Sequence, residues 1–487
     1  MSAVVIGVGV NELVAAHYLA RVGQRVLVLD HGSVTDETAT GWIPPRVVRN
    51  LELERAGLVI QSHDPWVAAA LPDGGRLELW HDMGRSVEAI RRLSPRDAEK
   101  WPEFCTRMAQ LAGVLEALYT APPPDPLTRA WRDFARLAAI GFGIRRHGRR
   151  GVEDLLRVLP MPVADLLDDW FECDALKGVL GAAGIMHARH GPRASGTAFR
   201  LLHEHVGNPA GVFRQPRSNV GRVLQGLPGV EIRRGAEIAR ITVREERVAG
   251  VVLADGNEIP ALVVVSGLDP RRTLTELVDP GWLDPAFART VRNIRCRGVV
   301  ARVALTLERE PGFSTLVVAP SLDYLERAAD DAKYGRISAA PYLEARSDRS
   351  RGGGGHCVDV HAQYAPYALA GGGWNDTCRA ALGRAVVECL AQHAPAIAAA
   401  TVEQSVHSPR DLEQVYGYPE GQAHHAELAL DQAFWMRPVP DLAQYATPIR
   451  GLYLCGMATH PGAGVNGASG ANAARAIARD LARRRNA

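Results

Sequence analysis

The chain has 487 residues, of which 47% are hydrophobic and 23% are charged. A chain of this length can bury a large core and usually forms more than one domain, and this composition excludes a disordered or fibrous protein. Its 56 lysines and arginines nearly balance its 54 aspartates and glutamates, so the overall charge does not attract nucleic acid. We therefore predict no nucleic-acid partner.

The cysteines and the N-terminus indicate a compartment. The seven cysteines show no CxxC spacing and are too sparse for a disulfide scaffold, which favours a reducing environment. There is no signal for export, and no apolar run reaches the roughly 18 residues that span a bilayer. We expect a cytoplasmic protein without a transmembrane helix. Adjacent His424 and His425 do not naturally face one ion, so we predict no metal site.

The N-terminal residues follow the order strand, glycine turn, helix, strand. Val4 to Ile6 form a short apolar run, apolar residues recur at helical spacing from Leu13 to Ala20, and Val26 to Leu29 form a second run. This order is typical of a βαβ unit.

Gly7-Val-Gly-Val-Asn-Glu12 connects the first strand to the helix, and Asp30 ends the second strand. Glycines let a pyrophosphate approach the backbone, the helix N-terminus attracts its charge, and a carboxylate at this place binds ribose hydroxyls. The motif predicts that Gly7, Gly9, Asn11 and Asp30 bind a dinucleotide, although a plain strand-to-helix turn is the alternative. Glu12 replaces the third glycine of the fingerprint, where its carboxylate either competes with a phosphate or points to solvent.

The middle of the chain changes character several times. Helical spacing dominates residues 77–210, and the prolines of residues 121–126 must interrupt any helix there. Residues 230–265 are strand-like and contain the turn signal Asp255-Gly256-Asn257, which predicts a β-meander feeding a buried strand. Residues 296–440 mix strands with a helix predicted from Thr377 to His393.

The C-terminal segment, residues 451–487, repeats the order strand, glycine turn, helix. We predict a strand from Leu452 to Leu454 and an alanine-rich helix from Ala471 to Ala482. The backbone between them offers N–H groups to an anionic or carbonyl-bearing ligand, which suits a flavin. The glycines of this turn are Gly456, Gly462, Gly464, Gly467 and Gly470.

Further segments accompany the two glycine turns: Asp169-Trp-Phe-Glu172, Gly196-Thr-Ala198, Pro409-Arg-Asp-Leu-Glu413, Arg437-Pro438 and Thr447-Pro448. With these segments, nearly the whole chain resembles the FAD-dependent desaturases and oxidases of the phytoene desaturase family, including its pyridine nucleotide-disulfide oxidoreductase domain-containing protein 2 branch. The C-terminal segment is the most specific part of the resemblance.

The resemblance implies an α/β fold, that of a Rossmann-like flavoprotein with two dinucleotide-binding domains and one FAD between the glycine turns. It implies a discontinuous FAD-binding domain made of residues 1–75, 211–295 and 441–487, and a mixed α/β substrate domain made of residues 76–210 and 296–440. The residues implied at the cofactor, besides Gly7, Gly9, Asn11 and Asp30, are Ile238, Gly456, Met457, Gly464, Val465 and Gly467.

Two segments depart from the family pattern. Family members usually carry paired glycines after the ribose-binding acidic residue and after the proline at position 216, but this chain has His31-Gly-Ser-Val34 and Arg217-Ser-Asn-Val220 there. Bulky side chains replace glycines that approach FAD closely. A protein that retains the fold with weak or lost FAD binding, and acts in binding or regulation, is therefore one alternative.

The leading function is FAD-dependent oxidation, in which a hydrophobic substrate, with a polyene or carotenoid as one candidate, is desaturated by hydride transfer to flavin N5. A flavin oxidase or ketolase acting on a polar natural product is the second alternative. His460, in the predicted flavin loop, is the candidate catalytic residue, as a hydrogen-bond donor or a proton carrier near neutral pH. Its alternative role is to hold its own loop.

A further pattern concerns peripheral contact with the inner face of a membrane. Apolar residues recur along one face of a helix that also carries arginines, which favours either a membrane-surface helix or a solvated helix of the substrate domain. No oligomeric state is indicated. The residues of this pattern are Leu127, Arg129, Trp131, Arg132, Phe134, Arg136, Ala138 and the basic run from Arg145 to Arg150.

Overall fold

The computed structural model describes residues 2–30, 32, 39–71, 73–123, 134–135, 138, 141, 148–348 and 356–485. Most of the candidate membrane-surface helix lies outside the described residues, and so do positions 31 and 33–38 after the ribose-binding candidate. Both interpretations of these segments stay predictions. In the part of the chain that is described, no helix is long and apolar enough to cross a membrane.

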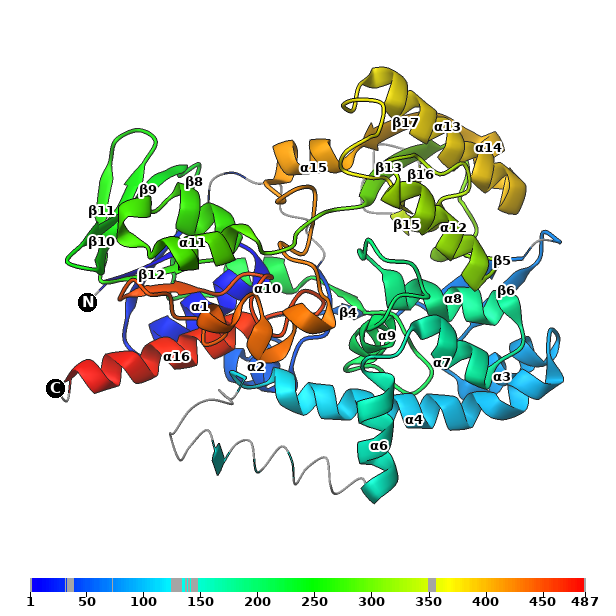
Figure 1. Ribbon diagram of the computed structural model, residues 1–487, viewed down its shortest axis with the longest axis horizontal. Helices are drawn as coiled ribbons and strands as arrows, with labels where there is room; N and C mark the ends of the chain where they lie inside the picture. Colours follow the sequence, from blue (N-terminus) through cyan, green and yellow to red (C-terminus); the bar gives the residue numbers. More distant parts are fainter. Residues whose placement is uncertain are drawn as a thin grey trace.

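A five-stranded parallel sheet brings both ends of the chain together (Figure 1). Its order is β18-β12-β1-β2-β8. The strands are β18 (Leu452–Leu454), β12 (Val263–Ser266), β1 (Ser2–Ile6), β2 (Arg25–Asp30) and β8 (Glu231–Arg234). The predicted strands at both ends are confirmed, and their partner strand β12 comes from the middle of the chain.

Both faces of this sheet are covered, and the alternation of side chains along β1 shows how. Ala3 and Val5 pack with helices α1 (Val10–Arg21) and α16 (Ala468–Arg485). Val4 and Ile6 face the opposite way and pack with residues of the β-meander and of α11 (Pro285–Arg292). Because successive strand residues point to opposite faces, a strand buried on both faces is apolar throughout.

The predicted β-meander is present, with one difference. Strands β9 (Ile238–Arg244), β10 (Arg247–Leu253) and β11 (Glu258–Pro260) form an antiparallel sheet. The strand-like residues before them do not join it, because β8 pairs in parallel with β2 at the edge of the five-stranded sheet. An apolar run does not specify which edge it pairs with.

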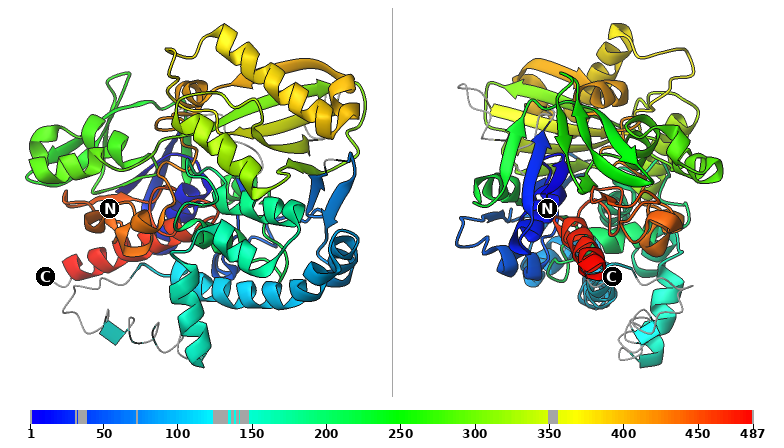
Figure 2. Two further views of the ribbon diagram at one scale, coloured as in Figure 1. Left: turned by 45° about the vertical axis from the view of Figure 1, so that its right-hand side comes forward. Right: turned by 90° about the vertical axis from the view of Figure 1, so that its left-hand side faces the viewer.

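The second large sheet has seven strands, in the order β17-β13-β16-β15-β14-β5-β6 (Figure 2). Helices α13 (Asp376–His393) and α14 (Pro395–Ala400) pack on one of its faces. The helix predicted from Thr377 to His393 is thereby confirmed. The strands are β17 (Thr401–His407), β13 (Val300–Leu307), β16 (His356–Gln363), β15 (Tyr342–Asp348), β14 (Thr315–Val318), β5 (Val67–Ala70) and β6 (Arg76–Leu79).

The hairpin of β5 and β6 crosses the predicted domain boundary at residues 75 and 76. Strand β5 pairs with β14 and β6, so residues 67–70 belong to the second sheet and not with the FAD-binding segments. The partner strand of β5 lies far along the chain, so no pattern of neighbouring residues predicts this pairing. The rest of the domain division stays a prediction.

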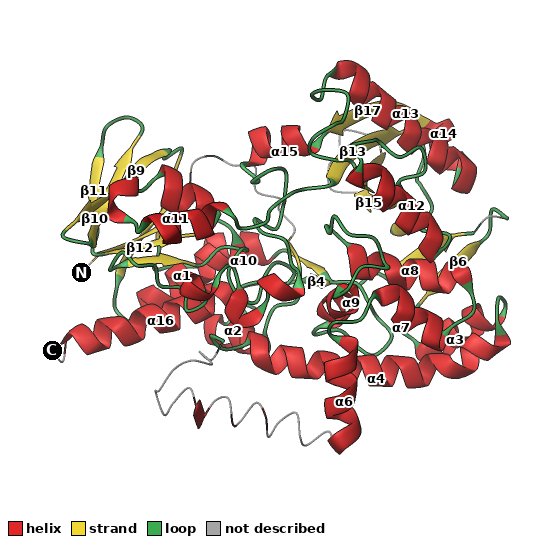
Figure 3. Cartoon of the chain, in the orientation of Figure 1, coloured by secondary structure: helices red, strands yellow, loops and turns green. Residues whose placement is uncertain are grey.

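The mainly helical region packs under the seven-stranded sheet (Figure 3). Helix α4 ends at Tyr119, directly before the proline-rich segment that was expected to interrupt it. The helices are α3 (Met83–Arg91), α4 (Pro95–Tyr119), α6 (Gly148–Val158), α7 (Val163–Trp170), α8 (Asp174–Ile185) and α9 (Thr197–His205). The remaining α-helices are α2 (Pro45–Leu51), α10 (Val220–Gly226), α12 (Leu322–Lys333) and α15 (Pro409–Tyr416).

Candidate functional site

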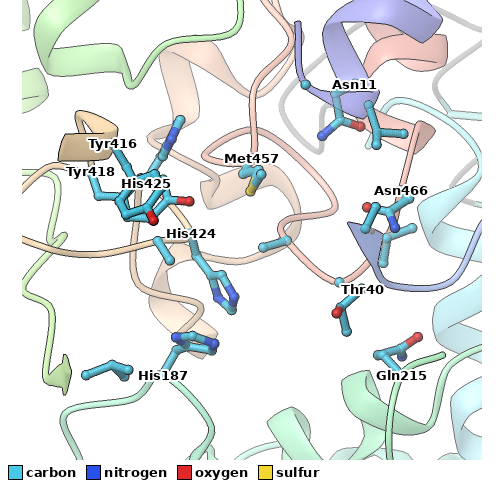
Figure 4. Close-up of a pocket in the computed structure, with 18 of the residues that line it drawn as sticks. Asn11, Thr40, His187, Gln215, Tyr416, Tyr418, His424, His425, Met457 and Asn466 are labelled. Carbon is cyan, nitrogen blue, oxygen red and sulfur yellow. The ribbon is translucent and has the colours of Figure 1, made fainter. Parts of the chain in front are cut away.

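A cavity of about 450 Å³ lies between the two glycine turns and the seven-stranded sheet (Figure 4). One end is lined by residues of both chain termini, and the other by strands β13, β15 and β16 together with α8, α9 and the segment that follows α15. The volume is in the usual range for a ligand pocket.

The N-terminal glycine turn forms part of the first end. Gly7 has φ of +104° and donates its N–H to Leu29 O at 2.8 Å, which fixes the turn against β2. Helix α1 begins after Gly9, whose lack of a side chain leaves the helix without a side-chain cap. The first amide groups of a helix have no acceptor within it, so they and the helix dipole favour an anion here.

The C-terminal turn forms the facing wall. Asn11 Oδ1 accepts a hydrogen bond from Gly467 N at 3.0 Å, which joins residues 456 positions apart in the sequence. Trp42 donates its N–H to Gly464 O at 2.9 Å and accepts one from Asn466 N at 2.7 Å. The turn is therefore held by α1 on one side and by the segment before α2 on the other.

The structure brings six of the predicted cofactor residues to the lining of this cavity. They are Gly7, Gly9, Asn11, Met457, Gly464 and Val465.

The other predicted residues do not line it. Asp30 is buried and accepts a hydrogen bond from Gly32 N at 3.0 Å, with Arg234 3.8 Å away. Ile238 is buried in the core of the meander. Gly456 and Gly467 pack against neighbouring segments of the protein. A Cβ on Gly456 would lie 2.2 Å from Gly267 O. Contact of these four residues with a cofactor stays a prediction.

His460 also lies outside the lining. Its ring is 1% exposed, Nε2 lies 3.1 Å from Leu118 O, and its backbone oxygen accepts a hydrogen bond from the Tyr445 hydroxyl. Burial, with the charge of Arg437, lowers the pKa of His460 to about 4. It is therefore neutral near pH 7, which favours the loop-holding role over that of a proton carrier.

Several features of the first end suit a flavin. Asn466 Nδ2 and Gln215 Oε1 belong to residues that line the cavity, and neither atom has a hydrogen-bond partner among the described residues. Buried polar atoms are normally paired, so an unpaired donor and an unpaired acceptor indicate a ligand with polar edges. The chain therefore has the groups to hold a dinucleotide with a polar ring system.

Glu12 is the exception. Its residue is only 7% exposed and lines the cavity, so the option that it points to solvent is wrong. The carboxyl lies directly against Gly9 and Gly267. A Cβ on Gly9 would be 2.3 Å from one carboxyl oxygen, and a Cβ on Gly267 would be 1.9 Å from the other. Sequence reasoning identified the substitution but not the direction of the side chain, which depends on the loop after β12.

The opposite end of the cavity is rich in charge. Glu344 is fully buried and lies 2.8 Å from Arg214 and 2.5 Å from Arg346. Burial alone would raise the pKa of Glu344, but the two arginines outweigh it and lower the pKa to about 2. Arg302 and Asp359 form a second ion pair at 2.6 Å. Four of these five residues lie on the paired strands β13, β15 and β16.

Three histidines lie beside these ions. The ring centroid of His187 is 4.8 Å from that of His361 and 4.2 Å from that of His424. Burial lowers the pKa of each, so all three are neutral near pH 7. No group of three potential ligands in the described ranges could hold a metal ion.

Sequence reasoning missed this charged end. A signal exists, because Glu344 and Arg346, like Asp359 and His361, alternate with apolar residues along strands. Period-2 alternation of ionisable and apolar residues places the charges on one face of a sheet. The register then pairs Glu344 with His361 and Arg346 with Asp359.

Known proteins were compared with the chain in sequence and fold. Residues 210–478 match the family described as flavin containing amine oxidoreductase. The chain is 30% identical to the pyridine nucleotide-disulfide oxidoreductase domain-containing protein 2 of Rattus norvegicus, over 98% of this chain and 93% of that protein. It is 23% identical to phytoene desaturase (neurosporene-forming) of Cereibacter sphaeroides, over 96% and 92% of the two chains.

Among solved structures, the cyclohexylamine oxidase of Brevibacterium oxydans superimposes with a TM-score of 0.56 over 99% of both chains, at 14% identity. At that identity the likeness concerns the fold, and it agrees with the α/β flavoprotein architecture predicted from the sequence. The extent of the family match and the full-length similarity to the Rattus norvegicus protein show the relationship. The chain belongs to the flavin containing amine oxidoreductase family, as one of its phytoene-desaturase-like FAD-dependent oxidoreductases.

Proposed function

We propose that the flavin of this protein is FAD, held between the two glycine turns. The α1 N-terminus would hold the pyrophosphate, since it offers amide groups and a positive dipole end. The C-terminal turn from Met457 to Val465 would hold the remainder. The unpaired polar atoms of Asn466 and Gln215 support this assignment.

We further propose that the protein dehydrogenates a C–C or related bond of its substrate. Bound FAD supplies the hydride acceptor, its N5 atom. The chain itself binds and orients the substrate and excludes water, which is the usual share of the protein in flavin chemistry. The similarity to a phytoene desaturase supports desaturation, and the single observation that carries the proposal is one cavity shared by both glycine turns and the second sheet.

A hydrophobic substrate, as in the leading prediction, is supported by the apolar part of the lining. The name of the desaturase relative points the same way. The apolar side chains that line the cavity beyond the glycine turns include Ala183, Met186, Phe213, Val300 and Leu412.

Oxidation of a polar substrate is the second candidate, and the charged end of the cavity favours it. Arginines and carboxylates pair there, with Arg214 and Arg346 beside Glu344 and Arg302 beside Asp359. Glu204 also lines the cavity, and burial raises its pKa to about 7 although Arg200 and Arg214 oppose this. Ions at a cavity wall interact well with polar or anionic groups and poorly with a hydrocarbon.

Anaerobic reduction of the FAD-loaded protein separates the two candidates. Polyene hydrocarbons in detergent and water-soluble carboxylates are mixed with it in parallel, and loss of the flavin absorption near about 450 nm is followed. Bleaching by polyenes alone supports the first candidate, and bleaching by carboxylates alone supports the second. Bleaching by neither class contradicts both substrate proposals.

A variant sharpens this comparison. Arg302→Gln removes one cavity cation whose partner Asp359 is 34% exposed, so the fold should tolerate the change. It should slow reduction by an anionic substrate and leave reduction by a polyene unchanged.

A further inference from the structure

The carboxyl group of Glu12 lies at the end of the cavity that the two glycine turns line. Its oxygens lie where side chains on Gly9 and Gly267 would begin, so the carboxyl fills the space between the N-terminal glycine turn and the loop after β12. The residue that usually stands at this position of the fingerprint has no side chain. In this chain a carboxyl group therefore lies where the dinucleotide fingerprint has no side chain.

The carboxyl has no counter-ion among the described residues, since no lysine, arginine or histidine there forms an ion pair with Glu12. Burial raises the pKa of Glu12 to about 7, and its own backbone amide only partly opposes the rise. A buried, unpaired carboxylate is costly, so the group favours its neutral form.

The elements around Glu12 provide few other charges. Cys455 follows β18, and burial together with the charge of Glu12 holds the pKa of its thiol well above the ordinary value. Asp269 and Arg272 line the same cavity from the segment after β12. Asp30, at the end of β2, has Arg234 3.8 Å away. None of these groups forms an ion pair with the Glu12 carboxyl.

A pyrophosphate bound at the α1 N-terminus would lie in the same turn of helix as this carboxyl. Both groups seek the same amide N–H groups and the same positive end of the dipole. Two anions in a poorly hydrated site repel each other, whereas a neutral carboxyl does not, and it can donate a hydrogen bond to a phosphate oxygen.

We propose that Glu12 is a cofactor-binding residue that makes FAD binding proton-linked: the protein binds FAD beside a neutral Glu12 carboxyl and loses affinity when that carboxyl ionises. The inference rests on the proposed binding of FAD in the cavity. It assigns this role to a residue at which the chain departs from the dinucleotide fingerprint.

The direction of the pH effect follows from this assignment. Below about pH 7 the carboxyl already carries its proton, so the dissociation constant of FAD should change little with pH. Above that pH a proton has to be taken up on binding, and the dissociation constant should rise by up to about tenfold per pH unit.

The test is titration of the cofactor-free full chain with FAD, followed by flavin fluorescence, at about pH 6 and about pH 9 and constant salt. Glu12→Gln keeps the shape of the side chain without its charge. It should bind FAD with similar affinity at both pH values, and more tightly than the unsubstituted protein at the higher one. Glu12→Gly restores the fingerprint and should also lose the pH dependence.

Glu427→Gln is the matched control. Glu427 is also buried and burial also raises its pKa, but it lies outside the cavity lining. This variant should keep the full pH dependence of FAD binding. Thermal unfolding of each variant checks that it is folded.

The possible failures are distinguishable. The inference alone is overturned if FAD binds but its affinity changes less than about twofold between the two pH values, or if Glu12→Gln follows the same pH dependence as the unsubstituted protein. Absence of FAD binding by all four folded proteins at both pH values overturns the proposed cofactor as well.

Discussion

Three glutamates that line the cavity differ in their ionisation states, and the difference lies in their neighbours. Glu344 lies between Arg214 and Arg346, which keep its pKa at about 2 in spite of burial. For Glu204 and Glu12 burial prevails and raises the pKa to about 7. Burial favours the neutral acid unless cations are close enough to compensate. Residue type therefore does not fix charge in this cavity.

The role of His460 can be tested by substitution. His460→Gln should leave the pH dependence of flavin reduction by substrate unchanged above about pH 6, because a histidine with a pKa of about 4 is already neutral there. It should destabilise the protein by about 1 kcal/mol through loss of the contact with Leu118 O. Rapid mixing at several pH values and urea unfolding provide the two measurements.

The control is His393→Gln, at the end of α13 and outside the cavity lining. A titration near neutral pH that is present in the unsubstituted protein and in this control, but absent from His460→Gln, would contradict the loop-holding role.

The packing of helix α1 against helix α16 holds the two glycine turns together. A Cβ on Gly470 would lie 1.9 Å from the backbone oxygen of Asn11, and one on Gly467 would lie 3.0 Å from Val14. The helices therefore approach each other at backbone distance near the start of α16. This approach allows Asn11 to bond Gly467 N and so joins the two ends of the chain.

Gly470→Ala should force these helices apart. Overpacking against backbone costs about 1–3 kcal/mol, so urea unfolding should show a loss of stability of that size. FAD affinity should fall as well, because the turns that face the cavity move with the helices.

Gly113→Ala provides the comparison. Gly113 lies in α4, and a Cβ there meets nothing within 4 Å. This change should stabilise the helix by about 0.5–1 kcal/mol. Equal effects of the two substitutions would contradict the importance of the helix contact.

Across the molecule, several neutral histidines near the cavity are buried or half-buried. Burial is the main reason that the pKa of each lies below the ordinary value. Five examples are His187, His203, His361, His424 and His460.

The protein should therefore lose stability as the pH falls below about 6.5, the pKa of histidine in the unfolded chain. Below that pH the unfolded state binds protons that the folded state does not, and each such histidine costs up to about 1.4 kcal/mol per pH unit until its folded pKa is reached.

Glu12 and Glu204 act in the opposite direction between about pH 7 and 4.5, since their pKa is raised on folding, but they are fewer. Melting temperatures at about pH 7.5 and about pH 5 test the balance. A melting temperature that is equal or higher at the lower pH would contradict it.

The local elements and the two glycine turns could be predicted from the order of the residues alone. The strand predicted from Leu452 to Leu454 matches β18, and the run from Val26 to Leu29 lies within β2. The turns that line the cavity were also identified from the residues. These features depend on periodicity and on glycine at particular backbone positions, both of which are properties of neighbouring residues.

The meeting of distant segments depends on the tertiary structure. It pairs β5 with β14 and β8 with β2, sets Glu344 opposite His361, and places Glu12 in the lining of the cavity. Each of these outcomes depends on contacts between residues far apart in the chain, and so do burial and the pKa shifts that follow from it. A local pattern fixes the conformation of a segment, but burial and charge state depend on what packs against it.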